Sequence, residues 1–281
     1  MLRALTAAAA VFVLGAGVAF AAGKAEHPHD HAFSFDSPVG SYDMAAVQRG
    51  FQVYQQVCAS CHSMDHLSYR HLGEQGGPFA AYMVRSHDTG EMEMVVRRPE
   101  HGGTFVDVTE NPWVRQIASE QTITAVDPNS GQLTDRPGRI SDRFRRPFPN
   151  EIAARASNGG AYPVDLSVIT SARHGGADYI YALLTGYTGE SQGLLYENPY
   201  FPGHLIAMPP PLGEGVVPYT DPNTPQTVEQ YAADVTHFLQ WAADPHMEER
   251  KRLGIVVLGF LLVLTALLYF AYKQVWRNES H

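Results

Sequence analysis

The chain has 281 residues, of which 29 are acidic and 20 are basic, and its formal net charge at pH 7 is −9. This acidic balance argues against nucleic acid as a partner and permits a basic protein partner. The 25 glycines and 19 prolines indicate many loops, and the length suffices for one large domain with a buried core.

The N-terminal residues predict a secretory signal peptide at positions 1–21. Arg3 supplies a positive start, a weakly apolar, alanine-rich stretch follows, and AFA at 19–21 places small residues at the cleavage site. A first membrane anchor is the alternative interpretation, which the modest hydrophobicity of this stretch disfavours. We therefore expect residues 22–252 to form an exported domain.

Three histidines follow in the sequence HPHDH, at positions 27–31. A short histidine-rich stretch can capture zinc or nickel. We expect a flexible N-terminal segment of the mature chain instead.

Residues 57–64 read VCASCHSM and contain both cysteines of the chain, Cys58 and Cys61, with His62 directly behind them. A thioredoxin-like redox pair would need a βαβ context, and zinc would need two more ligands. On a helix, positions i, i+3 and i+4 share one face, so two thiols can bond to one porphyrin while the imidazole faces its iron. The motif predicts one covalently bound haem c. An amphipathic helix leading into it is predicted by apolar side chains at intervals of three to four residues: Val47, Gly50, Phe51, Tyr54 and Val57.

The iron needs a sixth ligand, and Met208 is the strongest candidate. It lies in LIAMPPPL, 205–212, where three prolines fix φ and remove three backbone donors. Such a stiff loop lowers the entropy cost of presenting a thioether to the iron. Coordination by His174 or His204 is the alternative, and either could equally be a structural histidine. Methionine–histidine ligation suits electron transfer, whereas an open sixth position would suit peroxide chemistry.

The segment 224–243 predicts a second amphipathic helix. Thr224 is expected to cap it, with Pro225 in its first turn. His237 falls on this helix and is expected to be structural.

Near the C-terminus, 20 uncharged and mostly apolar residues, 253–272, predict one transmembrane helix, since this length spans a hydrocarbon core of about 30 Å. The tail 273–281 would then be cytoplasmic. Basic residues disagree with that orientation under the positive-inside rule, although the signal peptide and the cysteine motif favour it. Three of them precede the span and two follow it: Arg250, Lys251, Arg252, Lys273 and Arg277.

These motifs resemble the cytochrome c1 family, the membrane-anchored haem subunits of the cytochrome bc1 complex. The similarity begins at RGFQVY, runs through CASCHSM and covers well over half of the chain after the signal peptide. Its most specific pieces are RPGRISDRF (136–144), RPFPNEIAARASNGGAYPVDLSVI (146–169), ARHGGADYIYALLTGYTGE (172–190) and NPYFPGHLIAMPPPL (198–212).

The resemblance implies a mainly α fold: a cytochrome-c-like haem domain with long loop insertions and one C-terminal transmembrane helix. It assigns Cys58 and Cys61 to covalent haem attachment, and His62 and Met208 to the axial positions of the iron. It also places Arg136 beside a haem propionate, where a guanidinium can donate two parallel hydrogen bonds.

The same resemblance implies an electron-relay subunit that is not catalytic by itself. Its electron donor would be the Rieske iron–sulfur protein and its acceptor a soluble cytochrome c, with cytochrome b beside the anchor in a dimeric complex. The haem domain would lie on the periplasmic side of a bacterial inner membrane. The haem-c subunit of a terminal oxidase and a haem peroxidase remain alternatives.

Two regions depart from the family pattern. Segment 76–117 does not follow it, and the acidic run that relatives often have before the R-P-G element is reduced to Asp127 and Asp135. The docking face for cytochrome c is therefore left open by the sequence.

Overall fold

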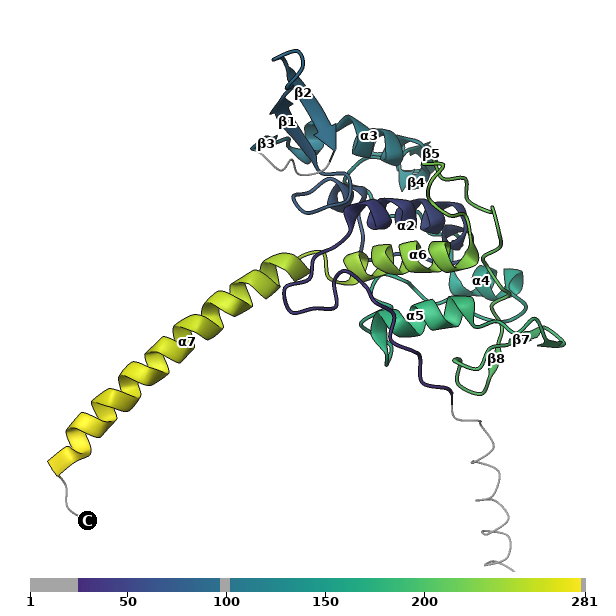
Figure 1. Cartoon of the computed structure of the whole chain (residues 1–281). Helices are drawn as coiled ribbons and strands as arrows, with labels where there is room; N and C mark the ends of the chain where they lie inside the picture. Colours follow the sequence, from purple (N-terminus) through teal and green to yellow (C-terminus); the bar gives the residue numbers. More distant parts are fainter. Residues whose placement is uncertain (1–24, 97–101, 279–281) are drawn as a thin grey trace, which may run out of the picture.

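The computed structural model describes residues 25–96 and 102–278, so the signal peptide predicted at 1–21 lies outside the described residues. Figure 1 shows a helical domain from which one long helix projects, and the expected mainly α fold is confirmed. The α-helices are α2 (Met44–Gln56), α3 (Pro112–Ser119), α4 (Glu151–Ser157), α5 (Gly176–Thr185), α6 (Val228–Ala243) and α7 (Met247–Val275). The strands are β1 (Ala81–Arg85), β2 (Met92–Val96), β3 (Thr104–Phe105), β4 (Thr122–Val126), β5 (Leu133–Pro137), β6 (Ser191–Gln192), β7 (Leu195–Glu197) and β8 (Leu205–Ile206).

The hydrophobic core is built around α2 and α6, which lie side by side (Figure 1). The apolar repeat upstream of the cysteines forms α2, as predicted. Phe51 and Tyr54 of this helix each contact the ring of Phe238, with centroids 5.5 Å apart. Gly50 marks the closest approach, because a Cβ there would lie 1.9 Å from the carbonyl oxygen of Asp234. Only glycine therefore fits between the two helices at this point.

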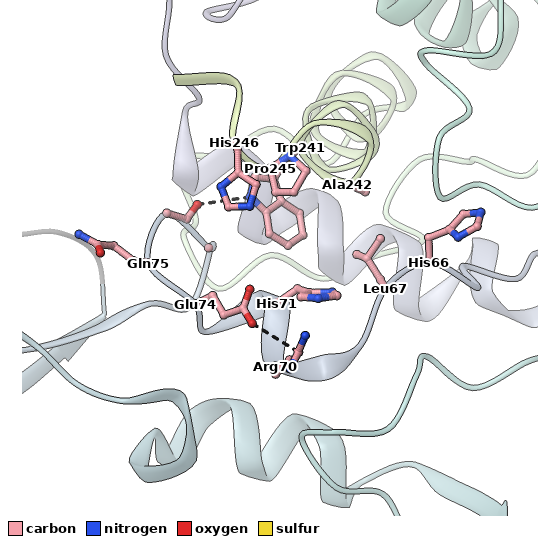
Figure 2. Close-up of a pocket in the computed structure, with 12 residues that line it drawn as sticks. His66, Leu67, Arg70, His71, Glu74, Gln75, Trp241, Ala242, Pro245 and His246 are labelled. Carbon is pink, nitrogen blue, oxygen red and sulfur yellow. Dashed lines mark hydrogen bonds and ion pairs between the residues drawn. The ribbon is translucent and has the colours of Figure 1, made fainter. Parts of the chain in front are cut away.

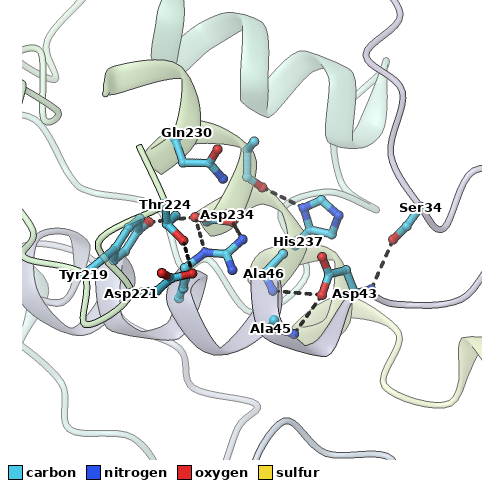
Figure 3. Close-up of polar contacts among 12 residues, drawn as sticks. Ser34, Asp43, Ala45, Ala46, Tyr219, Asp221, Thr224, Gln230, Asp234 and His237 are labelled. Carbon is cyan, nitrogen blue, oxygen red and sulfur yellow. Dashed lines mark hydrogen bonds and ion pairs between the residues drawn. The ribbon is translucent and has the colours of Figure 1, made fainter. Parts of the chain in front are cut away.

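A buried ion pair also joins these helices (Figure 3). Arg49 of α2 donates from Nε and Nη2 to the two carboxylate oxygens of Asp234 on α6, at 2.9 and 2.7 Å. The hydroxyl of Tyr219, in the loop before α6, donates to the same carboxylate at 2.8 Å. Asp234 is 1% exposed, so its charge depends on these three hydrogen bonds.

The start of α6 differs from the predicted one. The helix begins at Val228 and its N-cap is Thr227, whose hydroxyl accepts from the backbone N–H of Gln230 at 3.3 Å. The predicted cap, Thr224, instead donates its hydroxyl to Asp221 at 3.2 Å within the preceding turn. His237 is structural, as expected, and its Nδ1 donates to the carbonyl of Ala233 at 2.9 Å.

The expectation of a flexible segment at 27–31 is wrong from His31 onward. The backbone N–H of His31 donates to Asp178 of α5 at 2.9 Å, and its ring stacks on Tyr181 with centroids 4.1 Å apart. Phe33 then packs edge-on against His237 of α6 at 5.2 Å. Within the described part of the chain, no group of three or more His, Cys, Asp or Glu side chains is arranged to hold a metal ion.

In the described residues, three small antiparallel sheets interrupt the helical domain, with strand orders β2-β1-β3, β4-β5 and β6-β7-β8. The first sheet lies within 76–117, the segment that departs from the family pattern. The second contains Arg136, opposite Ile123 in the β4–β5 register. The third ends at Ile206, two residues before Met208, and so fixes the chain that leads to the candidate ligand.

The apolar C-terminal run forms α7, which is long and apolar enough to cross a membrane and is not buried against the domain. The helix begins at Met247, six residues before the predicted span. Within these first turns, the ammonium of Lys251 donates to the carbonyls of Phe35, Ser37 and Gly40 at 2.6, 2.8 and 3.4 Å. The N-terminal segment therefore clamps the first turns of α7 to the domain.

Candidate haem centre

The cysteine motif lies directly after α2, in a tight turn. The helix ends at Gln56, and Cys58–Ser60 form one turn of 3₁₀ helix, so the motif is not on a continuous α-helix as the sequence predicted. The backbone N–H groups of Cys61 and His62 both donate to the carbonyl of Cys58, at 3.1 and 2.9 Å. This turn keeps the two free, half-buried thiols and the imidazole together at one end of α2.

The electrostatics of the Cys58 thiol disfavour the redox alternative. Burial, with a smaller contribution from Cys61, raises the pKa of the Cys58 thiol to about 12. Cysteines of a thioredoxin-like redox pair have lowered pKa values, because the thiolate is the reactive species. A thiol that stays protonated at neutral pH suits a structural or covalently bonded role.

His62 presents the tautomer that an iron ligand needs. Its Nδ1 lies 2.7 Å from the carbonyl oxygen of Val164, and since a carbonyl can only accept, Nδ1 carries the hydrogen. Nε2 is then left with a lone pair, the usual arrangement when the second ring nitrogen is held by a backbone carbonyl. Burial lowers the pKa of His62, although the Val164 carbonyl and Asp165 act in the opposite direction. The donor set of two thiols and one neutral imidazole fits haem c.

Asp165 ties the segment after His62 to the segment that carries Val164. Its carboxylate accepts from Ser63 Oγ at 2.7 Å and from the backbone N–H of Asp65 and Ser167 at 2.8 and 2.9 Å. Burial raises the pKa of this carboxyl, but the hydrogen bonds outweigh burial and the net pKa is lowered. Sequence reasoning missed this residue, although the D-x-S pattern at 165–167 is a recognisable local turn signal.

Met208 follows β8 and is half-buried. In Figure 1 the last turn of α2 lies at the end of the helical core that is away from α7. Helix α4 and strand β8 lie at the same end. The hydroxyl of Tyr187 donates to the Met208 carbonyl at 3.0 Å. Of the alternative ligands, His174 is exposed and His204 occupies a left-handed turn with φ 61°.

Arg136, the residue expected beside a propionate, is half-buried and engaged by a carboxylate of this chain. Its Nη1 and Nη2 donate to the two oxygens of Asp142 at 2.7 and 2.8 Å, and Nη1 also donates to the carbonyl of Pro137 at 3.0 Å. This hydrogen bonding lowers the pKa of Asp142, despite partial burial. The propionate role stays a prediction, since the Asp142 pair by itself accounts for the position of Arg136.

A separate cavity of about 310 Å³ lies beside the junction of α6 and α7 (Figure 2). His71, Glu74, Trp241 and His246 are among its lining residues. The Nδ1 of His71 accepts from the backbone N–H of Ser68 at 3.0 Å, so its Nε2 carries the hydrogen and offers no lone pair. The cavity contains none of the predicted haem residues.

A profile of the Cytochrome C1 family matches residues 33–279. A protein of Rhodospirillum rubrum named cytochrome c1 is 37% identical over 300 residues, covering 99% of this chain and 98% of the relative. A Solanum tuberosum protein named cytochrome c1-2, heme protein, mitochondrial, is 43% identical over 274 residues, covering 93% of this chain and 90% of the relative.

A longer relative is cytochrome b/c1 of Bradyrhizobium diazoefficiens, which is 40% identical over 302 residues. The matched part covers 99% of this chain but 39% of that relative. The chain therefore spans about two fifths of the length of a protein whose name joins cytochrome b to c1.

Proposed function

The chain belongs to the cytochrome c1 family, and from that premise we propose that it relays single electrons from a Rieske iron–sulfur protein to a soluble cytochrome c. Members of this family are haem subunits of the cytochrome bc1 complex. When bound, haem c supplies a one-electron iron couple. No bond of a substrate is made or broken by the side chains proposed for this role.

Four side chains would hold the haem. Cys58 and Cys61 would bond covalently to the porphyrin through their sulfur atoms, while His62 and Met208 would be the two protein ligands of the iron. The observation that carries the proposal is the hydrogen bond from His62 to the Val164 carbonyl, because it fixes the ring orientation and leaves Nε2 as a lone-pair donor. Two thiols lie within four residues of this imidazole.

The membrane anchor supports a place in a larger complex. In our proposal α7 crosses a bacterial inner membrane once, contacts cytochrome b, and leaves the haem domain on the periplasmic side of a dimeric assembly. The hydrogen bonds from Lys251 to the N-terminal segment are consistent with this arrangement, because they would hold the haem domain in a fixed orientation relative to α7 and the membrane.

Replacing Met208 by leucine tests the ligand assignment. Methionine–histidine ligation raises the reduction potential, so Met208→Leu in the haem-loaded full chain should lower the midpoint potential and allow the reduced protein to bind carbon monoxide. Met92→Leu is the matched control, since Met92 lies exposed in β2 and should leave both properties unchanged. An unchanged potential in Met208→Leu would exclude Met208 as the ligand.

A further inference from the structure

The candidate ligand loop is held by very few hydrogen bonds. The β7–β8 pairing fixes the chain as far as Ile206, opposite Tyr196. Beyond it, the three prolines at 209–211 have no backbone N–H to donate. Among the residues that the structure describes, the hydrogen bond from the Tyr187 hydroxyl to the Met208 carbonyl is the only one formed within 208–212.

Tyr187 is itself anchored to a rigid part of the domain. It lies two residues past α5, whose C-cap is Gly186. A Cβ at Gly186 would lie 2.5 Å from the ring of Tyr200, so the end of α5 is in close contact with the turn that precedes β8. The side chain of Asn198, which is fully buried, donates to the carbonyl of Leu183 at 2.8 Å and locks this turn to α5.

The donor is available at physiological pH. The ordinary pKa of a tyrosine hydroxyl is about 10, so the hydroxyl keeps its hydrogen at neutral pH. The bond to a carbonyl requires that hydrogen, because both partners would otherwise be acceptors.

We infer that Tyr187 is the positioning residue of the proposed methionine ligand: its hydroxyl, fixed by the end of α5, holds the Met208 backbone so that the thioether would be able to bind the haem iron. This inference rests on the proposed ligation by Met208. The prolines make the loop stiff but do not orient it. Orientation comes from the sheet before Met208 and from the tyrosine hydroxyl at Met208 itself.

Tyr187→Phe removes the hydroxyl and keeps the ring. One net hydrogen bond shifts an equilibrium by roughly two- to tenfold, so the detached form of the loop should gain by that factor. Carbon monoxide competes for the position that the methionine occupies, and its binding rate to the reduced, haem-loaded full chain should rise by the same factor. A rate equal to that of the unaltered protein would overturn the inference.

Tyr42→Phe is the matched control. The Tyr42 hydroxyl also donates to backbone carbonyls, those of Asp244 and Gln240 at 2.9 and 3.2 Å, but at the junction of α6 and α7. Its loss should lower the thermal midpoint without changing the carbon monoxide rate. An equal rise in both tyrosine variants would show that the effect is general loosening, and would also overturn the inference.

Comparison with Met208→Leu separates this inference from the proposed function. Fast carbon monoxide binding by Met208→Leu together with an unaltered rate in Tyr187→Phe removes only the role of Tyr187. If Met208→Leu itself changes nothing, the ligand assignment has failed. Incorporating 3-fluorotyrosine at position 187 retains the hydroxyl and should retain the slow rate, whereas fast binding there would assign the effect to the ring and overturn the inference.

Discussion

Asp234→Asn should be among the most destabilising conservative substitutions in this chain. The carboxylate is 1% exposed and accepts two hydrogen bonds from Arg49 and one from Tyr219. Removing one partner of a buried ion pair costs about 3–5 kcal/mol, because the other charge is left uncompensated. The Arg49 side chain is 26% exposed, so water can partly solvate it, and we expect about 3 kcal/mol.

Urea unfolding of the full chain in detergent measures this cost. The free energy of unfolding depends on urea with a slope of about 2 kcal/mol per molar, so the unfolding midpoint should fall by about 1.5 M. Tryptophan fluorescence can follow the transition, because Trp241 is buried on α6. Glu151→Gln is the matched control: its partner is Arg155, both side chains are about half exposed, and such a pair contributes less than about 1 kcal/mol. A shift for Asp234→Asn no larger than that of Glu151→Gln would refute this account of the α2–α6 contact.

Two other substitutions have defined outcomes. Lys251→Met should cost about 1–3 kcal/mol by removing the charged donor of the hydrogen bonds to the Phe35 and Ser37 carbonyls, of which the first is partly buried; the measurement is a lower thermal midpoint of the full chain, which Lys273→Met near the other end of α7 should not cause. The pKa of Asp165 is lowered in the folded protein, so its stabilising contribution is complete above the unfolded value of about 4 and is lost as the pH falls through the folded value. Asp165→Asn should therefore lower stability at neutral pH and flatten its loss below about pH 4, and an acid limb identical to that of the unaltered protein would contradict this.

Features encoded by neighbouring residues could be predicted from the sequence. The apolar spacing that ends at Val57 predicted α2, and the uncharged run at 253–272 predicted most of α7. The cysteine motif likewise predicted a haem c protein, because haem attachment depends on a spacing of three and four residues along the chain. The helix boundaries were less accurate at α6, where two threonines three residues apart can both serve as caps and only the surrounding turn selects Thr227.

The small sheets were not predicted, for a physical reason. Strands β4 and β5 carry exposed apolar residues, with Val126 61% and Leu133 72% exposed, so alternation of apolar and polar side chains does not mark a buried face. Their pairing is instead favoured by the turn sequence between them, 127–132, where Asp127 accepts from the backbone N–H of Asn129 at 2.8 Å. Turn chemistry was the available signal in this region.

The supports of the candidate site were beyond sequence reasoning because they use backbone atoms. The acceptor for His62 is a carbonyl 102 residues away, and any residue could provide it. Tyr187 meets Met208 across 21 residues through another carbonyl. Residue identity was therefore enough to propose which side chains carry the chemistry, while the groups that contact them became visible only in the folded chain.

The basic residues in the first turns of α7, just before the predicted span, show how a sequence rule and a structure can be reconciled. The positive-inside rule applies to short loops, and long exported domains cross the membrane largely regardless of charge. Because the domain that precedes the span is long, the basic residues on its side of the membrane carry little weight under this rule. In the folded protein Arg250 pairs with Asp244, and Lys251 is held by backbone carbonyls of the N-terminal segment. These two charges have a structural task at the joint between domain and anchor, and their position does not oppose the proposed orientation.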